Sequence, residues 1–427
     1  MLIYFKVGNY KSIKEPVTIN FNASSITEHG GSNIAQEKHA SLLKSILLYG
    51  HNASGKSKIL DAFAFFSWFV RNSAKENQSS ERIDVNYFEL SDLTEKKPSF
   101  FEIAFLVGNK KYRYGFEADE QIIHKEWLLE TSIKKENPLF LRINNDFEID
   151  LKRFQNADGL KKRTRKNALF LSVASQWNVK KAEEIDEWFG NLSFIHGLKE
   201  NTYRIRTLAA LKDEKTSKLI QAFMKAADLG INSVDALSME VEKLLEQATD
   251  EDIKSEIKQR FVEKKETQFV VSLHSKYSNN NEKKTEVPFD FDMMESDGTI
   301  KYFNIAGAIV DSILKNKIVI IDEFDARLHT LLTKFILKLF NSEKTKSRAQ
   351  LLASCHDTAL LDNDILRRDQ IYFVEKDYIG ATKVTSLAQY KSRKDSPIDK
   401  NYMGGKFGAI PFISNIEDIF ADAIAEK

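Results

Sequence analysis

The chain has 427 residues, of which 42% are hydrophobic and 29% are charged, a composition typical of a folded protein with a substantial core. Its 63 basic and 62 acidic residues leave a net charge of +1, so bulk charge indicates neither a nucleic-acid-binding nor a membrane-surface protein. A single cysteine, Cys355, excludes an internal disulfide framework and favours a reducing compartment. The N-terminal segment lacks a signal-peptide pattern, and the longest apolar run, Ala62 to Val70 broken only by Ser67, is far shorter than the roughly 20 residues of a membrane span. We therefore expect a cytoplasmic protein of two or three structural units without a membrane segment.

The first part of the chain predicts strands around one long helix. Residues 2–21 alternate apolar and polar side chains about a Gly-Asn break and predict a β-hairpin. Residues 45–49 form a short apolar run that ends at a glycine, and residues 56–70 have the crowded apolar pattern of a buried helix. Residues 99–131 predict an antiparallel meander with Gly108-Asn109 as a turn.

A change of composition follows. Residues 180–264 are rich in Glu, Lys, Leu and Ala at helical spacing, and a basic stretch, residues 161–166, lies just before them. Both features fit solvated helix faces, and they also fit an electrostatic surface for a nucleic acid or an acidic partner. The sequence leaves these two interpretations open.

The last part of the chain predicts an alternation of strands and helices. Strands are expected around a polar turn in residues 268–292, and four elements follow it: helix 299–315, strand 317–321, helix 327–341 and strand 349–354. The predicted fold is α/β, a mixed sheet with an antiparallel meander and a helical insertion. The predicted units are a first lobe (1–179), a helical insertion (180–266) and a second lobe (267–427).

A glycine-rich segment lies between the predicted strand 45–49 and the helix that follows. Residues 50–57, GHNASGKS, fit the pattern G-x-x-x-x-G-K-[ST], and the strand–loop–helix context is the one this phosphate-binding loop requires. Its glycines let the backbone approach phosphates, and the helix N-terminus adds positive potential. The candidate nucleotide contacts are Gly50, Asn52, Ser54, Gly55, Lys56 and Ser57. Lys56 would offset the β- and γ-phosphate charge, and the Ser57 hydroxyl would bind Mg²⁺.

A second motif ends the predicted strand 317–321. Four apolar residues run into Asp322 and Glu323, and the carboxyl end of a buried strand is where α/β sheets gather their ligands. Asp322 is a candidate Mg²⁺ ligand, and Glu323 is a candidate for activating the attacking water.

Two further residues are candidate phosphate contacts because of where they lie relative to these motifs. His356 follows the next predicted strand end and is a candidate γ-phosphate contact. Ser296 opens a helical pattern in the string ESDGT, where it can cap the helix and leave N–H groups free for an anion.

The order of these motifs resembles that of ABC-type ATPase heads, in the branch that includes the SMC and RecF proteins. Within that branch, four segments resemble the AAA15 ATPases: NYKSIKEPVTINF, ESDGT, DEFDARLH and YMGGKFGAIPFI. These ATPases are subunits of bacterial phage-defence and abortive-infection systems, including the PARIS and RloA-like groups. The resemblance covers nearly the whole chain and is weakest over residues 180–264.

The resemblance implies roles for four more positions. Gln176, interpreted as following a strand, matches a glutamine that senses Mg²⁺ and the γ-phosphate. Lys11 matches a basic position that reaches the phosphates, and Ser296 and Gly298 match a signature that contacts the γ-phosphate bound by a second subunit. Many relatives in the wider ABC class carry aspartate where residues 328–329 are Leu-His here.

Two functions follow from the resemblance. In the first, at least two copies of the chain sandwich Mg²⁺-ATP and control a separate effector, a Toprim nuclease, in response to a phage-encoded trigger. A separate effector is expected because only 71 residues follow His356. In the second, the chain is a RecF- or SMC-like DNA-maintenance ATPase that binds DNA itself. DNA-stimulated hydrolysis would favour the second.

Overall fold

The structure is a computed structural model that describes residues 1–38, 40–75, 81–132, 135–197, 201–240, 266–391, 396–411 and 416–417. None of the helices in these ranges is both long enough and apolar enough to cross a membrane.

A six-stranded sheet with the order β11-β15-β16-β5-β17-β18 forms one layer of the fold. Its strands are β5 (Ser45–Tyr49), β11 (Leu192–His196), β15 (Ile318–Asp322), β16 (Gln350–Cys355), β17 (Ile371–Lys376) and β18 (Thr382–Ser386). All neighbours are parallel except β17 and β18. Strands β5, β15 and β16 are fully buried along their length, which explains their continuous apolar sequences. Because these strands are parallel, their carboxyl ends meet at one edge of the sheet.

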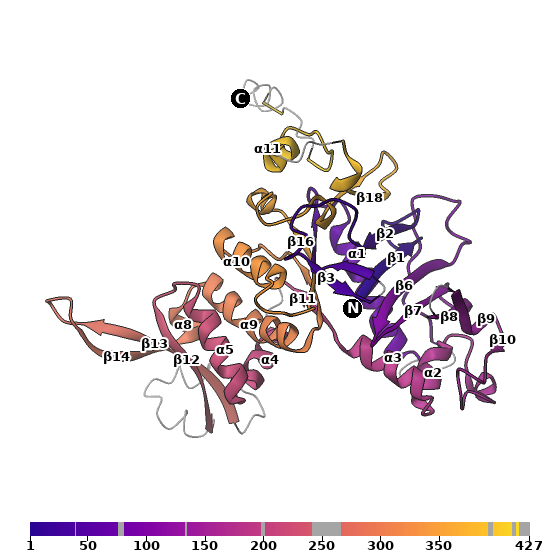
Figure 1. Ribbon diagram of the computed structural model, residues 1–427, viewed down its shortest axis with the longest axis horizontal. Helices are drawn as coiled ribbons and strands as arrows, with labels where there is room; N and C mark the ends of the chain where they lie inside the picture. Colours follow the sequence, from indigo (N-terminus) through magenta and orange to yellow (C-terminus); the bar gives the residue numbers. More distant parts are fainter. Residues whose placement is uncertain are drawn as a thin grey trace, which may run out of the picture.

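A seven-stranded antiparallel sheet with the order β10-β9-β8-β7-β6-β1-β2 forms a second layer. Its strands are β1 (Leu2–Gly8), β2 (Val17–Asn20), β6 (Ser99–Val107), β7 (Lys110–Ala118), β8 (Ile123–Ser132), β9 (Lys135–Ile143) and β10 (Asp146–Ile149). The predicted hairpin and meander are therefore confirmed, and the meander continues through two further strands. In Figure 1 this sheet lies on the right, in indigo to purple. Strands β3 (Ile34–Glu37) and β4 (Ala40–Leu43) pair separately.

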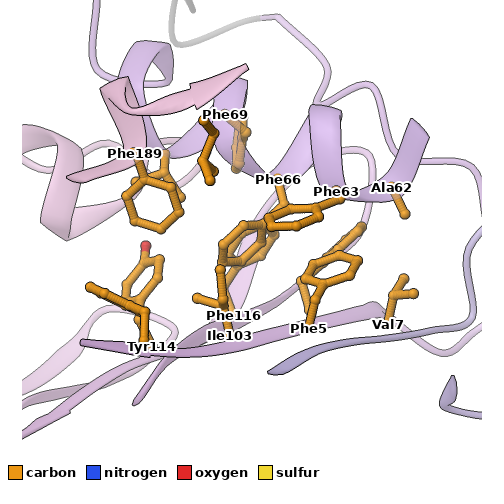
Figure 2. Packing of buried hydrophobic residues seen from close by; sticks show 14 of the residues in the cluster. Phe5, Val7, Ala62, Phe63, Phe66, Phe69, Ile103, Tyr114, Phe116 and Phe189 are labelled. Atoms are coloured by element: carbon orange, nitrogen blue, oxygen red, sulfur yellow. The ribbon is translucent and has the colours of Figure 1, made fainter. Parts of the chain in front are cut away.

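Helix α1 (Lys56–Asn72) packs between these two sheets. The ring of Phe63 stacks on Phe5 of β1 at 4.5 Å between centroids, and it meets Phe194 of β11 edge-on at 5.6 Å. Phe66 stacks on Phe116 of β7 at 5.4 Å. Figure 2 shows these aromatic side chains of α1 directed at the antiparallel sheet. Helix α1 is buried on two sides, and this explains why its sequence is nearly continuously apolar.

The opposite face of the six-stranded sheet is covered by helices. The remaining helices of the described chain are α2 (Phe170–Gln176), α3 (Lys180–Gly190), α4 (Asn201–Leu211), α5 (Glu214–Lys225), α8 (Phe291–Met294), α9 (Asp297–Lys315), α10 (Thr330–Asn341) and α11 (Ile398–Met403). Helices α4, α5, α9 and α10 share a second hydrophobic core with this face of the sheet, in which Tyr302 of α9 stacks on Phe223 of α5 at 4.3 Å. Helices α2 and α3 pack instead in the core around α1. The predicted α/β class is confirmed.

A three-stranded antiparallel sheet completes the described fold. Its strands are β12 (Ile231–Glu240), β13 (Glu266–Tyr277) and β14 (Lys283–Asp290), with the order β12-β13-β14. The predicted pair of strands around the turn at residues 278–281 is confirmed. In Figure 1 the hairpin of β13 and β14 extends away from the rest of the molecule at the far left.

The segment expected as a helical insertion, residues 180–266, is only partly helical. It holds α3, α4 and α5, but β11 is a strand of the six-stranded sheet and β12 pairs with β13. The expectation missed β11 because its five residues stand between two charged helices. Residues 241–265 lie outside the described residues, and the three domain limits remain a prediction.

Replacing Phe66 tests the packing of α1. Its ring is fully buried among aromatic side chains of β6, β7 and α3, so Phe66→Ala should lower the free energy of unfolding by about 3–5 kcal/mol. Trp68 of the same helix is 43% exposed, and Trp68→Ala should cost clearly less. Denaturant unfolding of both variants measures the difference. Equal losses would contradict the described burial.

Candidate functional site

The loop between β5 and α1 is shaped by two crowded glycines. A Cβ on Gly50 would lie 2.1 Å from the Val374 carbonyl oxygen, and a Cβ on Gly55 would lie 2.1 Å from Thr382 Oγ1. Gly55 also has φ +110°, which only glycine adopts without strain. Atoms of β17 and β18 therefore lie in close contact with this loop. Any larger residue at either glycine position would clash with them.

The Lys56 side chain is buried against this loop. Its Nζ donates to the carbonyl oxygens of Gly50 at 2.6 Å and His51 at 3.1 Å. Burial lowers the pKa of Lys56, while Asp322 and the other nearby acids oppose that shift. The fully buried hydroxyl of Ser54 has no hydrogen-bond partner among the described residues. The loop thus holds a desolvated cation and an unpaired buried hydroxyl beside each other.

One hydroxyl group organises the acidic pair. Ser354 Oγ at the end of β16 donates to the Asp322 carboxylate and accepts a hydrogen bond from the Glu323 backbone N–H at 2.8 Å. Glu323 has φ +51°, an uncommon conformation for a residue with a side chain. The serine therefore binds both the Asp322 carboxylate and the backbone of Glu323 at the strand edge.

The backbone after the acidic pair is held from two sides. Lys301 of α9, 1% exposed, donates through Nζ to the carbonyl oxygens of Glu323, at 3.2 Å, and of Ala326. The Asp325 carboxylate accepts from the backbone N–H groups of His356, at 2.8 Å, and of Asp357. The backbone of His356 is therefore held by the loop after β15 as well as by the strand that it follows, β16.

These groups surround a cleft of about 480 Å³. Its lining residues are Ser12, Asn52, Ala53, Ser54, Gly55, Lys56, Ser57, Lys58, Asp322, Glu323, Ser354, His356 and Lys376. Desolvation, and then the Lys56 ammonium group, lower the pKa of His356, so its imidazole is neutral at neutral pH. The sequence-predicted loop residues from Asn52 to Ser57 and the residues of the two strand ends therefore meet at one place. Gly50, also predicted as a nucleotide contact, lies outside this lining.

The cleft fits a Mg²⁺-bound polyphosphate. The loop backbone, the Lys56 ammonium group and the start of α1 are the kinds of contact that phosphates need. Ser57 and Asp322 line the cleft and would supply the one or two protein oxygens that Mg²⁺ takes when phosphates complete its shell. Within the described part of the chain there is no group of three or more His, Cys, Asp or Glu side chains able to hold a metal by themselves.

Lys11 and Gln176 do not line this cleft. Lys11 forms an ion pair with Asp61 of α1 at 3.6 Å. Gln176 is the last residue of helix α2, so the prediction that it follows a strand is wrong. The helix forms because the buried carboxylate of Glu126 accepts from the N–H groups of Phe170, at 2.6 Å, and Leu171, at 2.9 Å. This cap is 44 residues away in sequence and gives no local signal.

Ser296 and Gly298 also lie outside the cleft lining. Ser296 caps α9 as expected, since its Oγ accepts from the Thr299 N–H at 3.2 Å. A Cβ on Gly298 would lie 2.7 Å from the Arg327 carbonyl oxygen, so the first turn of α9 packs against the loop that follows Glu323. The roles of these two residues at a second subunit remain a prediction.

Sequence reasoning missed Ser354, Ser12 and Lys376 of the cleft. Ser354 stands two residues before His356 at the same strand end, and Ser12 adjoins Lys11, so both had a local signal. Lys376 reaches the cleft because β17 runs parallel to β5, and only the pairing of the sheet reveals this.

The crowding at Gly55 predicts the effect of Gly55→Ala. The added methyl group would meet Thr382 and strain the backbone, which costs on the order of 1–3 kcal/mol, so Mg²⁺-ATP binding should weaken by about tenfold or more. Gly159 has φ +74°, and an added Cβ there would find no described atom within 4 Å, so Gly159→Ala is the control that should bind normally. Titration with a fluorescent ATP analogue measures both. Unchanged affinity in Gly55→Ala would show that this loop does not hold phosphates.

The cleft residues lie within a segment shared with a known protein family. Residues 45–362 match the family described as "AAA domain, putative AbiEii toxin, Type IV TA system". No curated protein matches the chain.

Solved structures with partial similarity are SMC head domains. One is an SMC head bound to the C-winged-helix domain of ScpA, 14% identical, covering 91% of this chain and 98% of its own, with a TM-score of 0.44. A second is the SMC head domain from Thermotoga maritima, 10% identical, covering 90% and 98%, with a TM-score of 0.41. A third is an SMC head with an extended coiled coil bound to the C-terminal domain of ScpA, derived from Pyrococcus furiosus, 14% identical, covering 91% and 97%, with a TM-score of 0.36.

The family match begins at β5 and includes the phosphate loop, the acidic strand end and His356. It spans most of the chain and includes all residues that line the cleft except Ser12 and Lys376. The chain belongs to this family of AAA-domain proteins.

Proposed function

We propose that the protein binds and hydrolyses ATP and works as a switch subunit that controls a separate effector. The single observation that carries the ATPase proposal is the cleft in which Lys56, Ser57, Asp322, Glu323 and His356 come together from three strand ends. Each of these side chains is of the type that phosphoryl transfer from ATP to water requires.

The binding roles follow from position. Lys56 and the N–H groups of the loop bind the β- and γ-phosphates, and Ser57 and Asp322 hold Mg²⁺ through their oxygens. When bound, Mg²⁺ neutralises the charge that develops on the transferring phosphoryl group. Lys56 is already desolvated, and its attraction to phosphate is therefore stronger than that of a lysine in water.

The hydrolytic roles belong to Glu323 and His356. The Glu323 carboxylate orients a water molecule and takes its proton as the water oxygen bonds to the γ-phosphorus and the bond to the β-phosphate oxygen breaks, which releases ADP and phosphate. Ser354 and Lys301 hold the backbone on either side of Glu323, so its carboxylate starts near the required position. The His356 imidazole, which lines the same cleft, donates a hydrogen bond to the γ-phosphate.

The switch role rests on the signature residues. Ser296 and Gly298 lie outside the cleft lining of their own chain, and this supports the proposal that they contact the nucleotide of a second copy. ATP would then favour the closed dimer by the extra contacts made only in that state. Gln176 and Lys11 also lie outside the lining, and their contact with the nucleotide is part of this proposal.

The effector role has two supports. The family description includes the words "putative AbiEii toxin, Type IV TA system", which support a function in bacterial conflict or phage defence but do not name a separate effector. The described residues after His356 complete the nucleotide head, because β17 and β18 extend the sheet and the Ala409 carbonyl oxygen accepts from the His51 N–H at 2.9 Å. These described segments belong to the head. The effector that we propose is a separate nuclease of the Toprim type that responds to a phage-encoded trigger.

An alternative function is favoured by one surface feature. The basic segment 161–166 is largely exposed, and the Arg163 guanidinium lies 3.8 Å from the centre of the half-exposed Trp177 ring, an arrangement that suits nucleic acid. A DNA-maintenance ATPase would hydrolyse ATP faster when DNA is added to the isolated chain, whereas the switch subunit would not.

Glu323→Gln tests the catalytic assignment. The amide keeps the size of the side chain, so Mg²⁺-ATP should bind as in wild type while kcat falls by about 10²–10⁴ because the base is lost. The ATP-bound form should accumulate, and it should either retain the effector or keep it active. Binding titration and phosphate release measure the two effects, with Lys56→Ala as the control that loses binding. Normal turnover by Glu323→Gln would remove Glu323 from the mechanism.

Ser296→Arg tests the composite site. A bulky cation at the start of α9 should block ATP-dependent dimerisation and hydrolysis, while ATP binding by one chain is retained because the phosphate loop lies elsewhere. Asn280→Arg, in the exposed turn between β13 and β14, is the control and should hydrolyse ATP normally. Light scattering with ATP and phosphate release measure the outcomes. Hydrolysis at the wild-type rate by Ser296→Arg would exclude a role for the signature in a second subunit.

A further inference from the structure

The segment just before the signature is held by three carboxylates. Asp290 caps α8 by accepting from the N–H groups of Asp292, at 3.0 Å, and Met293, at 3.1 Å. Asp292 forms a two-point ion pair with the Arg204 guanidinium of α4. The third carboxylate is that of Glu295, the residue that directly precedes Ser296.

The Glu295 side chain turns back to β13. Its Oε1 accepts from Ser272 Oγ at 2.6 Å and pairs with His274 Nε2 at 2.8 Å, and the side chain is only 10% exposed. The His274 ring is itself stacked on Phe289 of β14 at 4.5 Å between centroids. Glu295 is therefore fixed by two donors, and stacking on Phe289 restrains the plane of the His274 ring.

This anchor lies one residue from the functional end of α9. The Ser296 hydroxyl caps the helix, Gly298 packs against the Arg327 carbonyl oxygen, and Lys301 in the same helix reaches the backbone of Glu323. The first turn of α9 is thus held on one side by the acidic-strand loop and on the other by the three-stranded sheet. Glu295 thus adds a direct attachment of this segment to β13, beside the Asp292–Arg204 ion pair and the packing of Phe291 on Phe303.

We propose that Glu295, held by Ser272 and His274, is a positioning residue that sets the direction in which Ser296 and Gly298 are presented to a second subunit. The proposal rests on the proposed ATPase function and on its composite site. Glu295 does not touch the nucleotide, and it acts through the residue that follows it.

The proposal separates hydrolysis from binding. Loss of the anchor displaces the signature but leaves the phosphate loop and both strand-end carboxylates in place. Because a misplacement of about 1 Å at a reacting site can cost 10²-fold in rate, kcat should fall by about tenfold or more while the Kd of one chain for Mg²⁺-ATP stays within about twofold. A group that only stabilises the fold would lower the unfolding temperature and leave kcat per folded molecule unchanged.

The experiment compares Glu295→Ala with Glu295→Gln in the full chain. The glutamine keeps the Oε1 acceptor for both donors, so it should retain kcat within about threefold of wild type, whereas the alanine should not. His274→Leu and His274→Gln form a second pair, since only the glutamine can still donate to Glu295. Glu286→Ala is the matched control, because Glu286 pairs with Lys283 on the neighbouring strand β14 and does not contact the signature segment. It should hydrolyse ATP as wild type does.

The readouts are phosphate release, titration with a fluorescent ATP analogue, and thermal unfolding of each variant. Low kcat with normal Kd in Glu295→Ala and His274→Leu, together with rescue in both glutamine variants, is the expected result. Wild-type kcat in Glu295→Ala overturns the inference, and so does an equal loss in Glu286→Ala. If Ser296→Arg also hydrolyses ATP normally, the composite site itself is wrong; if Ser296→Arg is inactive while Glu295→Ala is normal, only the positioning role is wrong.

Discussion

The burial of α1 between two sheets is the constraint on which the rest of the structure depends. Its aromatic side chains reach β1 and β7 on one side and β11 on the other, so neither sheet has a complete core without this helix. A helix fixed from both sides has a fixed N-terminus. Lys56 and the loop before it are therefore held at the carboxyl edge of the six-stranded sheet by hydrophobic packing that is remote from any ligand.

Buried polar contacts then join the other strand ends to this fixed point. Ser354 links β16 to the acidic pair, Asp325 links the acidic strand to the backbone of His356, and Lys301 links α9 to the same loop. Each contact satisfies a group that would be costly to bury alone. The chemistry of the cleft is thus distributed over three separate segments, but its geometry is determined by a few hydrogen bonds between them.

The sequence predicted those parts of the fold whose signals are contiguous. The hairpin of β1 and β2, the meander from β6, the loop before α1, and strands β15 and β16 each carry their pattern within a few residues, and the cleft residues Lys56, Asp322 and His356 follow from strand ends. The prediction failed where structure depends on distant partners. Helix α2 is capped by Glu126, and β11 is recognised as a strand only by its pairing with β15. The prediction missed Lys376 for the same reason, because its place at the cleft depends on the pairing of β17 with β5.

The conformation of Glu323 connects these observations. A residue with a side chain holds a positive φ only where its surroundings enforce it, and here both flanking peptide groups are bound. Its N–H donates to Ser354 Oγ at 2.8 Å, and its carbonyl oxygen accepts from Lys301 Nζ at 3.2 Å. Lys301 lies in the second turn of α9, whose first turn carries Ser296 and Gly298. In the proposed dimer, Ser296 and Gly298 contact the partner's nucleotide. They lie at the start of the same helix whose Lys301 binds the backbone of Glu323 in their own chain. The two sites of such a dimer would be connected through each chain as well as across the interface, by the hydrogen bonds of Lys301 and by the packing of Gly298 against the Arg327 carbonyl oxygen.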